Sequence, residues 1–476
     1  MNKYTKLFNN SIIFAFGSLS SKLIVILLVP LYTYYLSSQD YGVVDLITST
    51  QALIMPFITL TVEQAILRYI IGSKDKNEIN SIFSSAFFIC VISVFVFFIV
   101  CIILFYFRAW DQKLIIYFYL LICISSFQVI FSTYLRAVDK NKIFAVNGII
   151  QVLTLLVFNV LFLVVMDLGI DGYLISLILS YVISTIFCLC NSRGVGISYK
   201  LVSSKTLRKI ISFSFPLIPN YSMWWLVNNS TRYVVLSFVG LSANGLFAVA
   251  SKIPMCINVF VTVFQQAWQI SAFEEFESQD RSKYYSSVFR HYYLFLFLLA
   301  SFLLVINKWI FTYLVSDEYF LAWEMVPFLV FGVLYQTFSS FLGTIYTANY
   351  KTKSVFMTSA IGAGISIGSN FIFIPLYGAA YAGLGAALGF FVMWVFRLID
   401  TRKIVYTELN YREFFLLNVV YLIQIALLFI LRESSLFMVT AVQTFLFCIV
   451  IFISKGFIYT TFTFAKKKFF KKTLRN

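Results

Sequence analysis

Long apolar segments alternate with short polar connections along the whole chain, and this pattern predicts a bundle of membrane-spanning α-helices. Each segment has about 20 residues, the length at which an α-helix crosses a hydrocarbon core about 30 Å thick. The connection at 307–323 is long enough for a short re-entrant segment, so twelve or thirteen spans would also fit. We predict about fourteen spans, at 10–35, 42–68, 81–107, 114–136, 143–166, 171–190, 210–239, 243–271, 286–306, 323–346, 353–374, 378–398, 413–431 and 435–455.

Composition agrees with an all-α integral membrane protein. The chain is 61% hydrophobic and only 12% charged, whereas soluble domains carry about 25% charged residues. Lys3 and Lys6 precede the first apolar segment, but this segment is long, contains Lys22 and is not followed by a small-residue cleavage site. We therefore expect a retained first helix and not a cleaved signal.

The distribution of Lys and Arg predicts the orientation of the chain in the membrane. With the N-terminus inside, most of the 36 basic residues fall on the cytoplasmic side, and both termini are cytoplasmic. The net charge of +16 is then mainly a consequence of topology. The C-terminal run KKKFFKK (466–472) is expected to contact anionic lipid headgroups and not nucleic acid. The outer connections hold only Arg108, Lys113, Lys308 and Arg432, and the spans hold Lys22, Arg232 and Lys252.

Two sequence echoes indicate an internal repeat. LSSQDYGVVDL from Leu36 resembles LSANGLFAVASK from Leu241, and a shift of 211 matches Asn159 with Asn370 and Gly172 with Gly383. Both echoes run in the same direction with six spans between them, which is typical of a parallel repeat in transporters. We predict a six-helix lobe at 1–200, a second at 201–405, and two further helices with a basic tail at 406–476.

Lys22, Arg232 and Lys252 lie within apolar spans, where a charged side chain is costly unless it faces a polar cavity or a partner. The spans offer only two acidic partners, Asp45 and Glu63. Even if both acids pair, the interior keeps a positive charge. This balance favours a cavity for anionic cargo, and the alternative is simple pairing with the buried carboxylates.

One face of the span at 210–239 combines aromatic and polar residues. Tyr221, Trp225, Asn228 and Arg232 follow one another at intervals of one helical turn. A sugar-phosphate ligand would use Arg for charge, Asn for hydroxyls and aromatic rings for the apolar sugar faces. The alternative is a packing stripe, with Arg232 extending to the outer headgroups.

Asp45 and Glu63 are candidates for coupling to a proton or sodium gradient. If 42–68 is one helix, they share a face about 27 Å apart along the axis, and Pro56 bends the helix between them. Asp45 is as well placed to pair with Lys22 or to lie at the outer rim. Glu63 lies near the inner end, where Arg68 is an available partner.

The sequence does not predict an enzyme. We expect no catalytic residues, no metal site and no cofactor, because His291 is the sole histidine and no phosphate-binding loop pattern occurs. A membrane glycosyltransferase or polymerase would need a sizeable outer loop with catalytic residues, and the outer connections are short.

The chain resembles a known family in several segments. FPLIP at 215–219, the helix with Arg232 and the following SANGLFAVASK are similar to the seventh and eighth helices of Wzx-type polysaccharide flippases of the multidrug/oligosaccharidyl-lipid/polysaccharide exporter superfamily. PLYTYYLSSQDYGVVDL and YLRAVDKNKIFAVNGI are similar to the corresponding first-half elements. The likeness covers nearly the whole chain.

This resemblance implies two six-helix bundles around a V-shaped central cavity, with two extra C-terminal helices. It implies a flippase that moves undecaprenyl-diphosphate-linked oligosaccharide repeat units, of the O-antigen or capsule type, to the outer leaflet of a bacterial plasma membrane by alternating access. The implied partners are the lipid-linked oligosaccharide and membrane lipids, with a polysaccharide polymerase and a chain-length regulator as further candidates.

Two alternatives share this fold. A flippase for the lipid-linked peptidoglycan precursor is expected to have more arginines in its first two helices than this chain, which has only Lys22 there before Arg68. A cation-coupled multidrug exporter is expected to favour acidic over basic residues in its cavity, which is the reverse of the balance in this chain.

Overall fold

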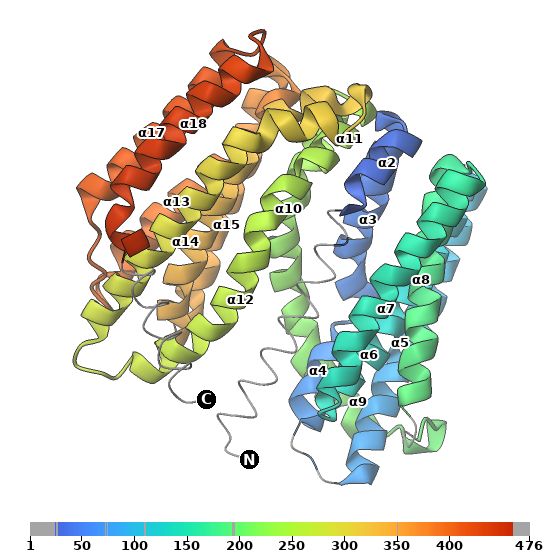
Figure 1. Cartoon of the computed structure of the whole chain (residues 1–476). Helices are drawn as coiled ribbons and strands as arrows, with labels where there is room; N and C mark the ends of the chain where they lie inside the picture. Colours follow the sequence, from blue (N-terminus) through green and yellow to red (C-terminus); the bar gives the residue numbers. More distant parts are fainter. Residues whose placement is uncertain are drawn as a thin grey trace, which may run out of the picture. The chain divides into compact units, whose positions relative to one another are not determined.

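A computed structural model describes residues 24, 27–71, 73, 75–108, 111–192, 196–349 and 351–459. Throughout these ranges the regular structure is helical (Figure 1). Within the described residues, 12 helices are long and apolar enough to cross a membrane. The prediction of an all-α membrane protein with twelve to fourteen spans is confirmed.

The chain forms two compact units, each with its own contacts. Unit 1 comprises Met1–Leu236 and Gly240–Ala248, and unit 2 comprises Ser237–Val239 and Val249–Asn476. The units group residues by contact, whereas the predicted lobes group them by sequence repeat. The lobe boundaries at 200 and 405 therefore stay a prediction.

Unit 1 is a bundle whose helices are joined by buried amide and hydroxyl groups. Gln51 on α3 donates to Ser125 on α6 (3.0 Å), and Gln128 on α6 donates to Ser184 on α8 (3.1 Å). Such contacts hold helices together in a membrane, where no water competes for the polar groups. Its helices are α2 (Val29–Tyr35), α3 (Ser38–Ile58), α4 (Val62–Ile70), α5 (Lys76–Tyr106), α6 (Gln112–Ala137), α7 (Asn141–Asn159), a π-helical turn (Val160–Val165), α8 (Gly169–Asn191), a short 3-10 helix (Tyr199–Leu201), α9 (Ser204–Ser214), a second 3-10 helix (Phe215–Leu217), α10 (Ile218–Phe238) and α11 (Leu241–Ala250).

The single helix predicted over 42–68 is wrong, because the chain breaks between α3 and α4. Leu60 and Thr61 adopt left-handed backbone angles (φ 48° and 52°), which an α-helix of L-residues does not tolerate in succession. Thr61 also donates to the carbonyl oxygen of Ser214 at 2.7 Å, so the break is held by a contact with the end of α9. Asp45 and Glu63 therefore lie on two different helices and do not share one helical face.

The span predicted at 210–239 also starts differently. An amphipathic helix, α9, ends at Ser214, and a 3-10 turn containing Pro216 leads into α10. Proline has no backbone N–H to donate, so Pro216 interrupts the hydrogen bonding of an α-helix at this point. The part that remains helical is α10, with 21 residues, and it is not among the described helices that are apolar enough to cross a membrane, so the span predicted at 210–239 is not found as such.

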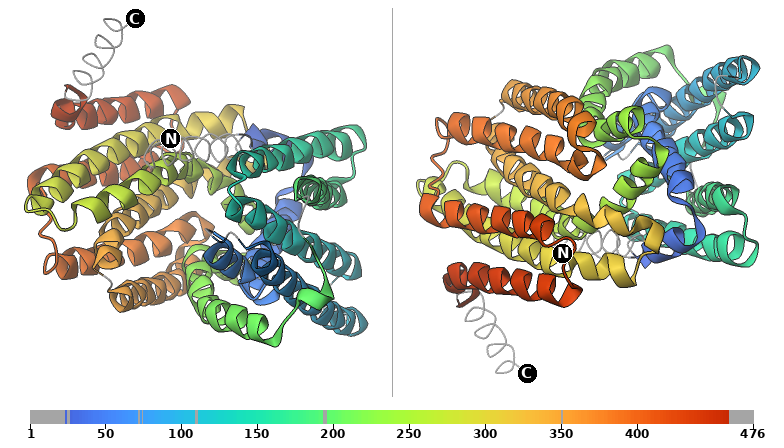
Figure 2. Two further views of the ribbon diagram at one scale, coloured as in Figure 1. Left: turned by 90° about the horizontal axis from the view of Figure 1, so that it is seen from below. Right: turned by 90° about the horizontal axis from the view of Figure 1, so that it is seen from above.

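Unit 2 carries the two extra C-terminal helices, α17 and α18, which lie side by side at one edge of this unit (Figure 2). Ser301 on α13 donates to Gln424 on α17 (2.8 Å), and Trp309 on α13 donates to Thr440 on α18 (2.6 Å). The long connection before α14 forms a short 3-10 helix (Asp317–Glu324). The helices are α12 (Lys252–Glu275), α13 (Arg281–Tyr313), α14 (Val326–Ala348), α15 (Thr352–Tyr377), a 3-10 helix (Ala379–Tyr381), α16 (Ala382–Thr401), α17 (Tyr411–Ile430) and α18 (Leu436–Ile453).

Candidate functional site

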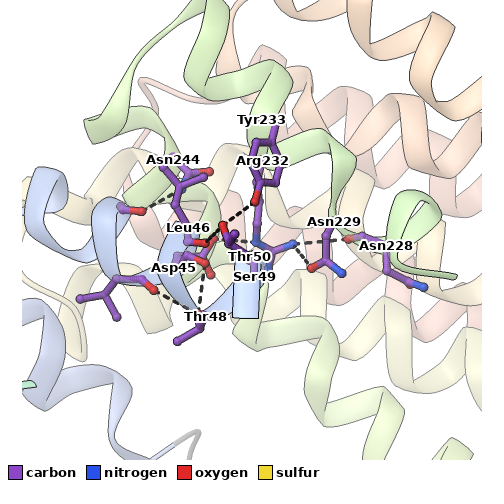
Figure 3. A network of polar contacts seen from close by, with 12 residues as sticks. Asp45, Leu46, Thr48, Ser49, Thr50, Asn228, Asn229, Arg232, Tyr233 and Asn244 are labelled. Carbon is purple, nitrogen blue, oxygen red and sulfur yellow. Dashed lines mark hydrogen bonds and ion pairs between the residues drawn. The ribbon is translucent and has the colours of Figure 1, made fainter. Parts of the chain in front are cut away.

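A polar network in unit 1 joins α3 to α10, and an ion pair lies at its centre (Figure 3). Arg232 Nε donates to Asp45 Oδ2 at 2.6 Å. The two side chains are only 15% and 9% exposed, so both charges are largely removed from solvent. Removing one partner of such a pair leaves an uncompensated buried charge, which is strongly destabilising. The structure pairs Asp45 with Arg232, whereas Lys22, the partner considered for Asp45 in the sequence, lies outside the described residues.

The guanidinium of Arg232 is oriented from several sides. Its Nη1 donates to Asn229 Oδ1 (3.1 Å) and to the carbonyl oxygen of Asn228 (3.4 Å), and its centre lies 5.4 Å from the ring of Phe247. Within the described residues, its Nη2 has no hydrogen-bond partner. Arg232 is thus held in position with donor capacity left for a ligand, since a guanidinium has five N–H groups.

Aromatic residues two turns before Arg232 and directly after it fix α10 against α3. Trp225 Nε1 donates to the carbonyl oxygen of Ser49 at 2.7 Å. Thr50 Oγ1 and Tyr233 Oη form a hydrogen bond of 2.7 Å, and the rings of Trp225 and Tyr233 are 5.3 Å apart. Trp225 therefore packs between helices, as the alternative of a packing stripe expects.

The other members of the predicted face differ from Trp225. Tyr221 is 37% exposed. Asn228 is also exposed, and its amide donates to the carbonyl oxygen of Trp224, one turn earlier, at 2.8 Å. Binding by Tyr221, Trp225, Asn228 and Arg232 stays a prediction, and Tyr221 and Asn228 are the members with accessible surface.

Next to the ion pair, the backbones of α3 and α11 touch. A Cβ atom on Gly42 would lie 2.2 Å from the carbonyl oxygen of Leu241, and one on Gly245 would lie 1.9 Å from that of Ser38. Asn244 Nδ2 donates to the carbonyl oxygen of Gly42 at 3.1 Å. Only glycine permits this approach, because any side chain at either position would overlap with backbone.

The two halves of this crossing correspond to one another in the sequence. In the echo of LSSQDYGVVDL and LSANGLFAVASK, Gly42 matches Gly245 at a shift of 203, and the same shift matches Ser38 with Leu241. Gly42 approaches Leu241, and Gly245 approaches Ser38. Ser38 and Leu241 are therefore counterparts in the repeat, as the two glycines are. The crossing has local two-fold character, which agrees with the predicted parallel repeat.

The remaining predicted residues lie elsewhere. Glu63 is on α4, and its Oε2 is buried without a hydrogen-bond partner among the described residues. Lys252 is the first residue of α12 and belongs to unit 2, whereas Arg232 belongs to unit 1. Lys22 lies outside the described residues. That Lys22, Arg232 and Lys252 face one cavity stays a prediction.

The chemistry available at the α3–α10 site is charge, amide and hydroxyl hydrogen bonding. Among the described residues, no group of three or more His, Cys, Asp or Glu could hold a metal ion. The sequence reasoning did not identify Asn229, Tyr233 or Thr50 as part of the site. Asn229 adjoins a predicted residue, but nothing in the pattern indicates that Thr50 and Tyr233 meet, since they are 183 residues apart.

Comparison with known proteins gives a family and a fold. Residues 7–269, more than half of the chain, match the family model described as polysaccharide biosynthesis protein. A membrane protein of Methanocaldococcus jannaschii, MJ1068, which is described as uncharacterized, is 20% identical over 416 residues, covering 79% of this chain and 80% of that protein.

Solved structures of transporters have the same fold. An inward closed structure of the lipid II flippase MurJ superposes with a TM-score of 0.69 at 14% identity, covering 95% of this chain and 100% of that chain. An inward-facing multidrug resistance MATE family transporter of the MOP superfamily gives 0.66 at 13% identity, covering 81% and 94%. At these identities the likeness concerns the fold, and it agrees with the all-α membrane fold that the Wzx resemblance implies.

Proposed function

Because the chain belongs to the polysaccharide biosynthesis protein family and has the fold of MOP-superfamily transporters, we propose that it is a flippase for lipid-linked oligosaccharides. Its cargo would be an undecaprenyl-diphosphate-linked repeat unit of the O-antigen or capsule type. The protein would move this cargo from the cytoplasmic to the outer leaflet of a bacterial plasma membrane, with both termini in the cytoplasm. It performs transport and not catalysis.

The observation that carries the proposal is the state of Arg232. This residue is largely buried, is held by one carboxylate and keeps an Nη2 donor without a partner in the described residues. Arginine binds phosphate through two parallel N–H groups, which gives both charge and geometry. A lipid-linked diphosphate must leave water during flipping, and it needs a cation of this kind to compensate its charge.

Exchange of partners at this pair would couple binding to movement. When the diphosphate binds Arg232, it competes with Asp45, and the link between α3 and α10 weakens. Asp45 is then an unpaired carboxylate in a desolvated place, where it gains most from a proton or Na⁺. This makes Asp45 the leading candidate for coupling to an ion gradient, and Glu63, with its unpartnered buried oxygen, the second.

The close contact of α3 and α11 at Gly42 and Gly245, the glycine crossing, would close the protein at the outer side of the membrane. The Lys and Arg distribution predicts that α3 and α11 begin at the outer side of the membrane. Direct backbone contact at Gly42 and Gly245 then seals this end, and cargo release to the outer leaflet requires the two helices to separate. Tyr221 and Asn228 would contact the sugars, and Lys22 and Lys252 would supply further positive charge.

Flipping in proteoliposomes tests the proposal directly. A fluorescent undecaprenyl-diphosphate oligosaccharide is incorporated, and its appearance in the opposite leaflet is measured by quenching. We expect Arg232→Ala, Lys22→Ala and Lys252→Ala to lose flux per reconstituted protein molecule while the protein remains in the membrane. Wild-type flux in all three variants would contradict the cationic site. Collapse of a proton or sodium gradient in the same vesicles identifies the coupling ion.

The fold shared with the lipid II flippase makes a peptidoglycan precursor the second candidate cargo. The same vesicles distinguish the two, because lipid II and the oligosaccharide lipid differ only in the sugar and peptide part. Faster flipping of lipid II than of the oligosaccharide lipid would favour the second candidate. Export of cationic dyes without flipping of either lipid would favour a multidrug exporter.

A further inference from the structure

An apolar groove of about 390 Å³ lies between α5, α6 and α8 in unit 1. The one hydroxyl in its lining belongs to Thr185 and donates to the carbonyl oxygen of Tyr181 on the same helix (2.7 Å). The groove therefore offers no polar group to a ligand, and a hydrocarbon chain is the occupant that suits it. Its wall includes Phe87, Phe127, Phe131, Ile186, Leu189 and Ile197.

A basic surface lies on α9, which packs against α5, one of the helices that line the groove. Lys205, Arg208 and Lys209 line one exposed face of the helix, together with Ser204 and Ser212. The opposite face is apolar and buries Ile210 completely. A helix with one basic and one apolar face is typical of the membrane–water interface, where it attracts anionic headgroups.

Hydrogen bonds hold the basic surface and the groove at fixed positions along α5. Ser81 Oγ bonds to Thr206 Oγ1 on α9 at 3.2 Å. Ser84 Oγ donates to the carbonyl oxygen of Gly196 at 3.0 Å, and the next residue of that segment lines the groove. Phe87 follows Ser81 by six residues, about 9 Å along the helix. The cations and the groove thus lie at successive depths, as the head and the first part of a lipid chain do.

The charge of the basic surface is only partly neutralised. Lys209 is 3.5 Å from Glu78 and lies over the ring of Tyr69 at 4.3 Å. Within the described part of the chain, no carboxylate pairs with Lys205 or Arg208. Two uncompensated cations and two serine hydroxyls suit a headgroup with more than one negative charge.

We propose that this surface and groove form a loading site for one polyprenyl diphosphate lipid of the inner leaflet. The diphosphate binds Lys205 and Arg208, and the first isoprene units lie against Phe87, Phe131 and Ile186. A single groove fits a lipid with one chain, whereas a phospholipid has two chains and a headgroup of lower charge. This site rests on the proposed function and extends it, because it holds the cargo before Arg232 does.

Photolabelling of the full-length protein tests the site. The probe is an undecaprenyl diphosphate that carries a diazirine in its first isoprene units, added below saturation to the protein in phosphatidylcholine nanodiscs. We expect labelled peptides from 124–131 and 182–197. The double variant Lys205→Gln/Arg208→Gln should reduce this labelling roughly 30-fold, since each cation near a membrane surface contributes about 1 kcal/mol.

Two controls separate local binding from general effects. Lys351→Gln/Lys353→Gln removes the same charge from exposed positions in unit 2 and should leave labelling unchanged. Ile186→Trp fills the groove from its exposed rim and should reduce labelling while the cations remain. Excess phosphatidylglycerol should compete weakly, because it carries one negative charge.

The following results would overturn the proposal. Labelling confined to other segments, or unchanged in the double variant, would show that the surface is not a loading site. Equal competition by phosphatidylglycerol would make it a general site for anionic phospholipids. Failure here is distinct from failure of the proposed function, because the flux defect of Arg232→Ala is measured independently of the label.

Discussion

Two arginines within the helical bundle, one in each unit, are satisfied in opposite ways. Arg232 in unit 1 pairs with the carboxylate of Asp45 and keeps 15% of its side chain exposed. Arg397 on α16 in unit 2 is 3% exposed, and none of its hydrogen bonds goes to a carboxylate. The first arrangement neutralises the charge, and the second solvates it with neutral dipoles.

Uncharged acceptors surround the guanidinium of Arg397. Its Nε donates to Thr358 Oγ1 (3.0 Å), its Nη1 to the carbonyl oxygen of Ser339 (2.8 Å), and its Nη2 to Ser359 Oγ (2.9 Å). Gly343 makes room for it, because a Cβ there would lie 2.9 Å from Nη1. These acceptors come from α14 and α15, so Arg397 joins three helices of one unit.

The difference shows which arginine can change partner. The acceptors of Arg397 all belong to its own unit, and losing one of them weakens the solvation of a buried charge. Arg232 has one strong partner and a donor to spare, so an incoming anion can bind its guanidinium and compete with Asp45. Arg397 therefore stabilises the bundle, and Arg232 is the one suited to bind cargo.

The largest loss of stability is expected when Arg397 is replaced. Arg397→Met should lower the free energy of unfolding by about 3–5 kcal/mol, because three helices lose their common donor and several acceptors stay buried. The measurement is the protein level in membranes and the thermal unfolding in detergent. A normal protein level combined with lost flux would reverse the roles assigned to the two arginines.

The double variant Asp45→Ala/Arg232→Ala separates the effect of the ion pair on stability from its effect on flux. Each single variant leaves an unpaired buried charge and should lose about 2–4 kcal/mol of stability. The double variant should recover at least about 1 kcal/mol of that loss, because neither charge remains. Flux should stay at least tenfold below wild type, since no cation binds the diphosphate. Recovery of flux together with stability would mean that the pair is only structural.

A third prediction concerns the glycine crossing beside Arg232. Gly245→Ala places a Cβ 1.9 Å from the carbonyl oxygen of Ser38 and should force α3 and α11 apart. We expect flux to fall roughly tenfold, a change of about 1.4 kcal/mol, because the proposed outer closure no longer forms. The matched control is Gly364→Ala in α15, where a Cβ meets nothing within 4 Å. Equal flux in the two variants would remove the closure from the mechanism.

The smallest effect is expected at Trp225. Trp225→Phe loses the hydrogen bond to the carbonyl oxygen of Ser49 but keeps the aromatic packing on α10. The loss should be about 1 kcal/mol of stability, with flux within about threefold of wild type. Measured in the same vesicles, a flux defect as large as that of Arg232→Ala would instead assign Trp225 a direct contact with cargo.

Hydropathy was sufficient for the class of fold because membrane insertion is decided segment by segment. A run of about 20 apolar residues must be helical to satisfy its own backbone in lipid, whatever the rest of the chain does. Because hydropathy describes one segment at a time, it also led to the wrong prediction of a single helix over 42–68. The apolar run over 42–68 continues through Leu60 and Thr61, so hydropathy does not reveal a break that depends on backbone angles and on a contact with Ser214.

The order of the residues was enough to identify a helical membrane bundle and to match the positions of Gly42 and Gly245. Only the tertiary structure decided that these glycines touch each other and that Asp45 pairs with Arg232, 187 residues away. It also placed Arg397 in a cage without a carboxylate. The physical reason is that the cost of a buried charge is set by the groups within a few ångströms of it, and these come from helices distant in the sequence.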